Sequence, residues 1–138
     1  MNNIKSEDLT IFLVDDQKIT NFINKKLIEI TGICKKVYDF TIPKTALEYL
    51  EVHKPDLILL DLNMPEINGW DFLESMEKYS THAEVIIVTS STSKLDQEKA
   101  RSYSRVIKYY TKPLNQYILR KLAEKYQRKM PLKNTVKQ

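Results

Sequence analysis

Glycine and cysteine are scarce in this chain, which has two glycines and one cysteine among its 138 residues. The two glycines, Gly32 and Gly69, are too far apart to form the glycine-rich loop that cradles phosphates, which argues against a flavin or nucleotide module. The lone Cys34 excludes a disulfide framework and a zinc cluster of cysteines. This usage is typical of a reducing compartment, and we expect Cys34 to be a small buried apolar residue.

Long apolar runs are also absent, and none approaches the length that crosses a membrane. The polar residues 1–8 include Glu7 and Asp8 where a signal peptide would need apolar ones. We therefore expect a cytoplasmic protein with no membrane partner. Basic residues exceed acidic ones by 22 to 18, and several lie near the C-terminus. They could bind nucleic acid, but lysine and arginine also complement the dipole of a final helix, and we favour this second interpretation.

Short apolar runs rich in branched residues recur along the chain, as is typical of strands buried on both faces of a parallel sheet. Four are clear, at residues 11–14, 57–60, 85–88 and 106–110, and a weaker one at 36–40 suits an edge strand. Helical segments lie between them. The alternation predicts one α/β domain at residues 9–129, a doubly wound five-stranded parallel sheet in three layers, between a polar lead at 1–8 and a polar tail at 130–138.

The clearest helical spacing follows the first strand. Its apolar residues are expected to face the core as one stripe: Ile19, Phe22, Ile23, Leu27 and Ile30. Gly32 would then end this helix. By contrast, residues 92–103 contain few apolar positions among many charges, and we expect a marginal, mobile helix there.

Polar side chains follow four of the predicted strands at the point where each strand ends. They are Asp15 and Asp16, then Asp61, then Thr89 and Ser90, and finally Lys112 directly before Pro113. Because ligands of open parallel sheets bind beyond the carboxyl ends of the strands, these side chains are expected to meet at one rim. Three close carboxylates repel one another unless a cation lies among them, and Mg²⁺ (or Mn²⁺) prefers such oxygen ligands. Lys112 supplies a positive charge that can pair with Asp61.

Each of these residues also has an ordinary structural interpretation. Asp15 or Asp16 could cap the helix that follows, and Thr89 or Ser90 could do the same for the next one. Capping would explain either pair by itself, but it does not explain why polar residues of these types follow four of the predicted strands. A functional rim is therefore favoured.

The motifs resemble, in order and spacing, those of the receiver domain of two-component response regulators. They are Asp15-Asp16, the run Asp61-Leu62-Asn63-Met64-Pro65-Glu66-Ile67-Asn68-Gly69, then Thr89-Ser90 and Lys112-Pro113. The resemblance covers about residues 9–126 and implies a flavodoxin-like sheet with strand order 2-1-3-4-5. One departure is visible, since Arg105 stands where many receivers have glycine.

The resemblance also implies a role for each site residue. Asp61 would be the phosphoacceptor, with Lys112 and Thr89 contacting the phosphoryl group. Asp16, Asp61 and the backbone carbonyl of Asn63 would bind the metal, and Asp15 would contribute through water. Thr89 and Tyr109 would be the switch residues, and the Lys112–Pro113 peptide bond would be cis.

The implied function is that of a stand-alone response regulator. It would accept a phosphoryl group from a sensor histidine kinase or a histidine phosphotransfer protein, and then switch the binding of an unknown downstream protein or relay the group. It would not be an enzyme, because it would catalyse only its own Mg²⁺-dependent phosphorylation and dephosphorylation. A metal-dependent phosphatase is disfavoured because Asn63 stands where its general acid would be expected, and intact motifs argue against a degenerate docking module.

Overall fold

The computed structural model of the chain describes residues 9–33 and 36–129, with side chains described as far as residue 126. The predicted polar lead, Cys34 and the predicted tail lie outside these residues. In the described part, no helix is both long and apolar enough to cross a membrane.

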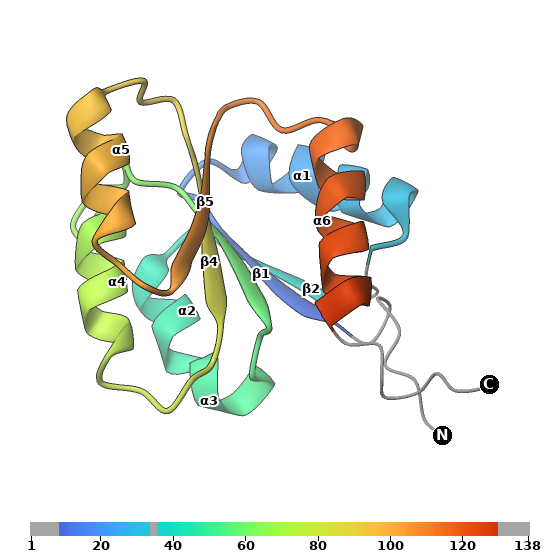
Figure 1. Cartoon of the computed structure of the whole chain (residues 1–138). Helices are drawn as coiled ribbons and strands as arrows, with labels where there is room; N and C mark the ends of the chain where they lie inside the picture. The colour runs from blue at the N-terminus through green and yellow to red at the C-terminus, as the bar shows by residue number, and fades with distance from the viewer. Residues whose placement is uncertain (1–8, 34–35, 130–138) are drawn as a thin grey trace.

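Five strands form one parallel sheet in the order β2-β1-β3-β4-β5 (Figure 1). They are β1 (Thr10–Val14), β2 (Lys36–Phe40), β3 (Leu57–Leu60), β4 (Glu84–Thr89) and β5 (Val106–Thr111). Each lies within one residue of its predicted bounds, and β2 lies at an edge as expected. The predicted fold class and strand order are confirmed.

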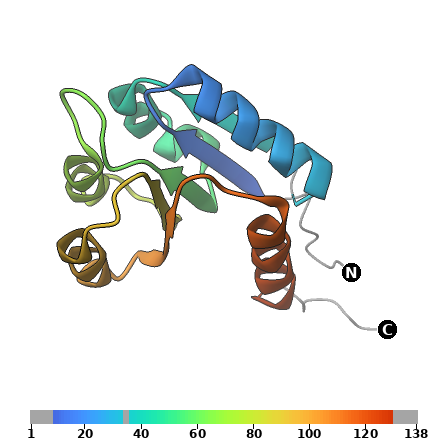
Figure 2. The same cartoon turned by 90° about the horizontal axis from the view of Figure 1, so that it is seen from above.

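Helices cover both faces of the sheet, which gives three layers (Figures 1 and 2). On one side lie α1 (Lys18–Thr31) and α6 (Gln116–Lys129). On the other lie α2 (Pro43–Glu48), α3 (Leu50–His53), α4 (Gly69–Met76) and α5 (Lys94–Arg101). Alternate strand residues point into these two layers, so that Phe12 and Leu13, for example, belong to separate apolar clusters. Because all five strands are parallel, their carboxyl ends share one edge of the sheet.

The predicted inward face of α1 is wrong. Four residues of the expected stripe are 50–63% exposed, namely Ile19, Phe22, Ile23 and Ile30. The helix instead buries Asn21, Asn24 and Ile28. Its end is as predicted, because Gly32 adopts a left-handed conformation with φ 68° and its N–H donates to the carbonyls of Ile28 and Glu29.

Helix α5 has little apolar contact with the sheet, as its sequence indicated. Among its residues only Ala100 is buried, and Leu95 is exposed. A ring stack lies beside it: Trp70 and Tyr103 have centroids 5.7 Å apart and planes inclined by 20°. The ammonium of Lys99 lies 4.8 Å from the Trp70 ring centroid. A cation–π contact of Lys99 thus links α5 to α4, and the mobility of α5 stays a prediction.

Arg105 has a structural role that a glycine could not fill. Its guanidinium donates to the carbonyl oxygens of Thr81 and Ala83 at 3.3 and 3.0 Å. Within the described residues, positive φ occurs at Lys54, Glu66 and Gly32 but not at Arg105. The loop before β5 therefore has no need of glycine. β5 has one extra residue in its pairing with β4, since Val85 pairs with Val106 and Ile86 with Lys108.

Candidate functional site

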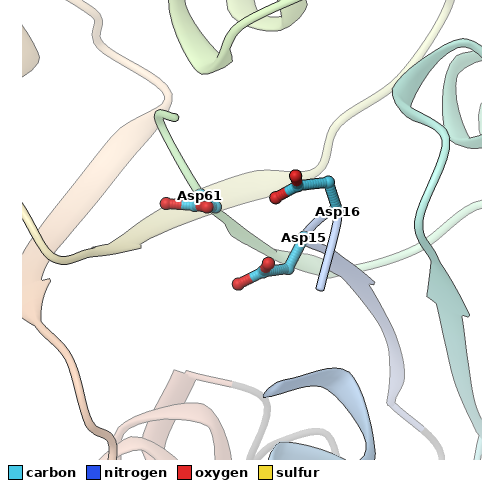
Figure 3. A group of neighbouring side chains, drawn as sticks. All are labelled: Asp15, Asp16 and Asp61. Carbon is cyan, nitrogen blue, oxygen red and sulfur yellow. The ribbon is translucent and has the colours of Figure 1, made fainter. Parts of the chain in front are cut away.

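Three aspartates meet where β1 and β3 end, as the strand-end pattern predicted (Figure 3). Asp15 and Asp16 follow β1, and Asp61 follows β3 beside it. Each offers a carboxylate oxygen, and these oxygens all lie within 4.8 Å of one another. Asp15 and Asp61 are buried, whereas Asp16 is more exposed. The rim thus combines two desolvated carboxylates with one that reaches solvent.

Lys112, which follows β5, brings a positive charge into this cluster. Its ammonium lies 2.7 Å from Asp15 Oδ2 and 3.5 Å from Asp61 Oδ2. The sequence suggested a pair with Asp61, but the shorter contact is with Asp15. The peptide bond between Lys112 and Pro113 is cis, and the Lys112 N–H donates to the carbonyl of Thr89 at 2.8 Å. The hydrogen bond to Thr89 holds the backbone of Lys112 beside the end of β4.

The oxygens of the two buried aspartates are used differently. Asp15 Oδ1 accepts a hydrogen bond from the N–H of Gln17 at 2.9 Å, and its Oδ2 contacts Lys112. Asp61 Oδ1 is buried, and no described residue donates a hydrogen bond to it. A buried carboxylate oxygen without a partner is costly, and a hard divalent cation removes that cost. The donor set therefore fits Mg²⁺, with Asp61 and Asp16 better placed than Asp15 to bind it directly.

Burial and neighbouring charges both shift the pKa values of this cluster. Desolvation and the charge of Asp15 raise the pKa of Asp61 above its ordinary value, although Lys112 works in the opposite direction. For Lys112, burial alone would lower the pKa. The hydrogen bond and charge of Asp15, together with Asp61, outweigh this and raise the pKa of the ammonium. The lysine consequently stays charged at neutral pH.

Capping does not account for these residues. Gln17 occupies the position that precedes α1, and no side chain caps this helix. Ser93 caps α5 by accepting from the N–H of Asp96, so neither Thr89 nor Ser90 has that role. The structural alternative considered for the strand-end residues is therefore wrong.

Thr89, at the end of β4, belongs to a chain of hydrogen bonds that leads away from the carboxylates. Its hydroxyl oxygen accepts from the N–H of Ser91 at 3.3 Å and from the amide of Asn63 at 3.5 Å. Ser91 in turn donates its hydroxyl to Asp96 at 2.6 Å, and its carbonyl accepts from the Tyr109 hydroxyl at 3.0 Å. The sequence identified Thr89 and Tyr109 but gave no sign that Ser91 joins them.

The loop between β3 and α4 passes very close to Gly69. A Cβ atom at this position would lie 2.7 Å from the backbone oxygen of Asp61 and 2.8 Å from Cα of Leu62. The N–H of Gly69 donates to the carbonyl of Leu62 at 2.9 Å. Only glycine allows this approach, which holds the backbone of Asp61 against the start of α4.

Like Ser91, Asn21 is a residue near the site that the sequence analysis did not identify. Asn21, in α1, donates its amide Nδ2 to the carbonyls of Asp15 and Phe40 at 3.0 and 3.2 Å. A signal for it existed. Asparagine is a poor helix former, and here it lies inside a predicted helix, five residues after an acidic pair.

Comparison with known proteins agrees with this geometry. Residues 11–124 match the sequence profile of the response regulator receiver domain. The cyclic di-GMP phosphodiesterase response regulator RpfG of Xanthomonas campestris is 32% identical over 113 residues, which cover 81% of this chain and 30% of RpfG. The polar-differentiation response regulator DivK of Brucella ovis is 29% identical over 111 residues, which cover 77% of this chain and 85% of DivK.

Among solved structures, a two-component response regulator from Cytophaga hutchinsonii is similar with a TM-score of 0.76 and 30% identity. The similarity covers 84% of this chain and 94% of that one. The chain spans less than a third of RpfG, so the phosphodiesterase activity in that name concerns RpfG alone.

Proposed function

Because this chain belongs to the response regulator receiver domain family, we propose that it accepts a phosphoryl group on Asp61 and transmits its phosphorylation state to a partner protein. The observation that carries the proposal is the buried carboxylate of Asp61 beside Asp15, Asp16 and Lys112. One of its oxygens is buried and has no hydrogen-bond donor among the described residues, so a cation could bind it. Its catalysis would be limited to its own phosphorylation and dephosphorylation.

A divalent cation belongs to this proposal. Asp16 and Asp61, with the backbone carbonyl of Asn63, would hold Mg²⁺, and Asp15 would contribute through water. The cation would neutralise charge on the phosphoryl oxygens during transfer. Asp15 is less suited to direct binding, because both of its oxygens already have partners in Gln17 and Lys112.

The reaction would be an in-line displacement. A carboxylate oxygen of Asp61 forms a bond to the phosphorus of a phosphohistidine while the P–N bond breaks, and the imidazole leaves with the electron pair. Phosphoryl transfer has a loose transition state, so positioning and neutralisation supply most of the catalysis. Lys112 and the hydroxyl of Thr89 would contact the phosphoryl oxygens.

The donor would be a sensor histidine kinase or a histidine phosphotransfer protein. A surface suited to such a partner lies beside the site, where the first turns of α1 expose Ile19, Phe22 and Ile23. Exposed apolar residues gathered on one helix face commonly mark a protein contact. The downstream partner would then recognise the change that spreads from Thr89 through Ser91 toward Tyr109 and α5.

The central test is mass spectrometry of the intact protein after incubation with Mg²⁺ and acetyl phosphate. We expect one added phosphoryl group in the wild type and none in Asp61→Asn or without Mg²⁺. Phosphorylation that persists in Asp61→Asn would reject Asp61 as the acceptor. Full-length protein that gains no phosphoryl group from acetyl phosphate or any histidine donor would reject the proposed function.

The partner surface is tested separately with Phe22→Ser. This variant should react with acetyl phosphate at the wild-type rate but accept the phosphoryl group from a phosphorylated histidine protein at least several-fold more slowly. Leu95→Ser is the control, because Leu95 is also an exposed apolar residue but lies on α5. Equal loss in both variants would show that the α1 face has no special role.

A further inference from the structure

Asn21 is a buried amide directly under the acidic loop. Its side chain is 1% exposed, and its Nδ2 reaches the carbonyls of Asp15 at 3.0 Å and Phe40 at 3.2 Å. Both partners are acceptors, which establishes that the nitrogen and not the oxygen of the amide faces them. A single side chain therefore bridges the ends of two neighbouring strands, β1 and β2.

Backbone hydrogen bonds hold the same segment, residues 15–21, at both of its ends. The N–H of Asp15 donates to the carbonyl of Phe40 at 3.1 Å, and the N–H of Asn21 donates to the carbonyl of Gln17 at 3.2 Å. Asp16 lies between these fixed points. The segment that carries Asp15 and Asp16 is consequently held on one side by β2 and on the other by the first turn of α1.

The amide is costly for the fold itself. Its Oδ1 is buried, and no described residue donates a hydrogen bond to it. Asparagine is also a poor helix former, and an apolar residue at this position would have a higher helix propensity and leave no polar atom unpaired in its side chain. Stability alone therefore does not explain why a polar side chain is buried here, whereas its contacts with the loop do.

We propose that Asn21 is a positioning residue for the acidic site, which sets the Asp15–Asp16 loop so that the carboxylates can bind a divalent cation. This inference rests on the proposed function, because it assumes that the cluster binds Mg²⁺. It also accounts for the orientation of α1. Turning Asn21 inward toward the two carbonyls turns Phe22 and Ile23 outward, where they are exposed beside the site.

Asn24 provides a matched control. It lies one turn further along α1 and is buried at 7% exposure, and its side chain makes no hydrogen bond with the described residues. Replacing either asparagine by leucine or alanine removes the same amide from the same helix. Only the change at Asn21 removes contacts with the acidic loop.

The experiment measures Mg²⁺ affinity of the full chain by isothermal titration calorimetry, with thermal melting to confirm folding. We expect Asn21→Leu and Asn21→Ala to bind Mg²⁺ about tenfold more weakly, as is typical when a group that orients metal ligands is lost. Asn24→Leu and Asn24→Ala should stay within about twofold of the wild type. In metal-free protein, hydrogen exchange at residues 15–17 should be faster only in the Asn21 variants.

Two failures can be told apart. If the wild type binds Mg²⁺ and the folded Asn21 variants bind it equally well, Asn21 is not a positioning residue. The inference also fails if the Asn24 variants lose as much affinity as the Asn21 variants. If the wild type binds no Mg²⁺ and gains no phosphoryl group, the proposed function fails and the cation-positioning role of Asn21 fails with it. Hydrogen exchange then shows whether the amide still holds the loop.

Discussion

The ammonium of Lys112 contacts the carboxylate of Asp15 at 2.7 Å and stands 0.8 Å further from Asp61, at 3.5 Å. Asp15 thus acts as the principal counter-ion of the lysine in the cluster. Since the ammonium and a bound divalent cation would face the same carboxylates, they repel each other. The lysine should therefore weaken cation binding while it aids phosphoryl transfer.

Lys112→Ala should strengthen Mg²⁺ binding and slow phosphorylation. Without the ammonium, Mg²⁺ affinity should rise by on the order of tenfold, because two like charges no longer share the site. Phosphorylation by acetyl phosphate, and the response to it, should fall, since the phosphoryl oxygens lose a cationic partner. Calorimetry and intact-mass measurements check both effects. Lys108→Ala is the control, because Lys108 is an exposed lysine of β5, the strand that Lys112 follows. A fall in both quantities would contradict the inferred repulsion.

Gly69→Ala adds only a methyl group, but it should lower stability and slow phosphorylation. The added Cβ would meet the backbone oxygen of Asp61 at 2.7 Å, and a backbone atom cannot move aside as a flexible side chain can. We expect a loss of about 1–3 kcal/mol in the free energy of unfolding, typical of overpacking, together with slower phosphorylation.

The other glycine provides the control for this change. Gly32→Ala meets no atom within 4 Å but keeps a residue at φ 68°. It should cost about 1–2 kcal/mol through backbone strain alone and leave the rate of phosphorylation unchanged. Urea denaturation and acetyl phosphate kinetics measure both variants. Equal kinetics in the two variants would show that the contact with Asp61 is unimportant.

Tyr126 should give the protein a sensitivity to alkaline pH. Burial, and then its 2.7 Å hydrogen bond to Glu84, raise the pKa of Tyr126 above its ordinary value of about 10. Because the folded pKa exceeds the unfolded one, this group stabilises the fold fully below pH 10, and its contribution is lost as the pH rises further.

Tyr126→Phe should therefore lower the free energy of unfolding by about 1 kcal/mol at neutral pH and flatten its decline above pH 10. Tyr117→Phe is the control, since Tyr117 lies on the same helix with its side chain exposed. Denaturant melts from pH 8 to 11 provide the comparison. Identical pH profiles for the two variants would mean that the buried hydroxyl is not linked to stability.

Trp70→Ala should loosen α5. Trp70 contacts Lys99 of α5 and stacks on Tyr103, which lies just after this helix, and Ala100 is the residue of α5 that is buried. Loss of an aromatic pair costs about 0.5–1.5 kcal/mol, so hydrogen exchange of residues 94–101 should accelerate by roughly threefold to tenfold. Trp70→Phe can still stack on Tyr103, so its exchange rate should lie between those of the wild type and Trp70→Ala. Unchanged exchange in Trp70→Ala would show that other contacts hold α5.

Much of the fold and the rim could be predicted from the sequence because their signals are local. Branched apolar runs identified four strands and a weaker alternating segment the fifth, each within one residue, and Gly32 correctly marked the end of α1. Asp15, Asp16, Asp61 and Lys112 were found together because parallel strands end at one edge. The family assignment, which rested on four separated motifs, is confirmed.

What only the tertiary structure decided depends on contacts between distant segments. The rotation of α1 was mispredicted because apolar residues occupy more than one of its faces, and the buried face is the one on which Asn21 reaches the carbonyls of Asp15 and Phe40. The choice of Asp15 as the closer partner of Lys112 follows from the positions of β1 and β5, which no spacing along the chain encodes. Sequence periodicity thus determined the elements and their residues, whereas directional polar contacts across the sheet determined how those residues face one another.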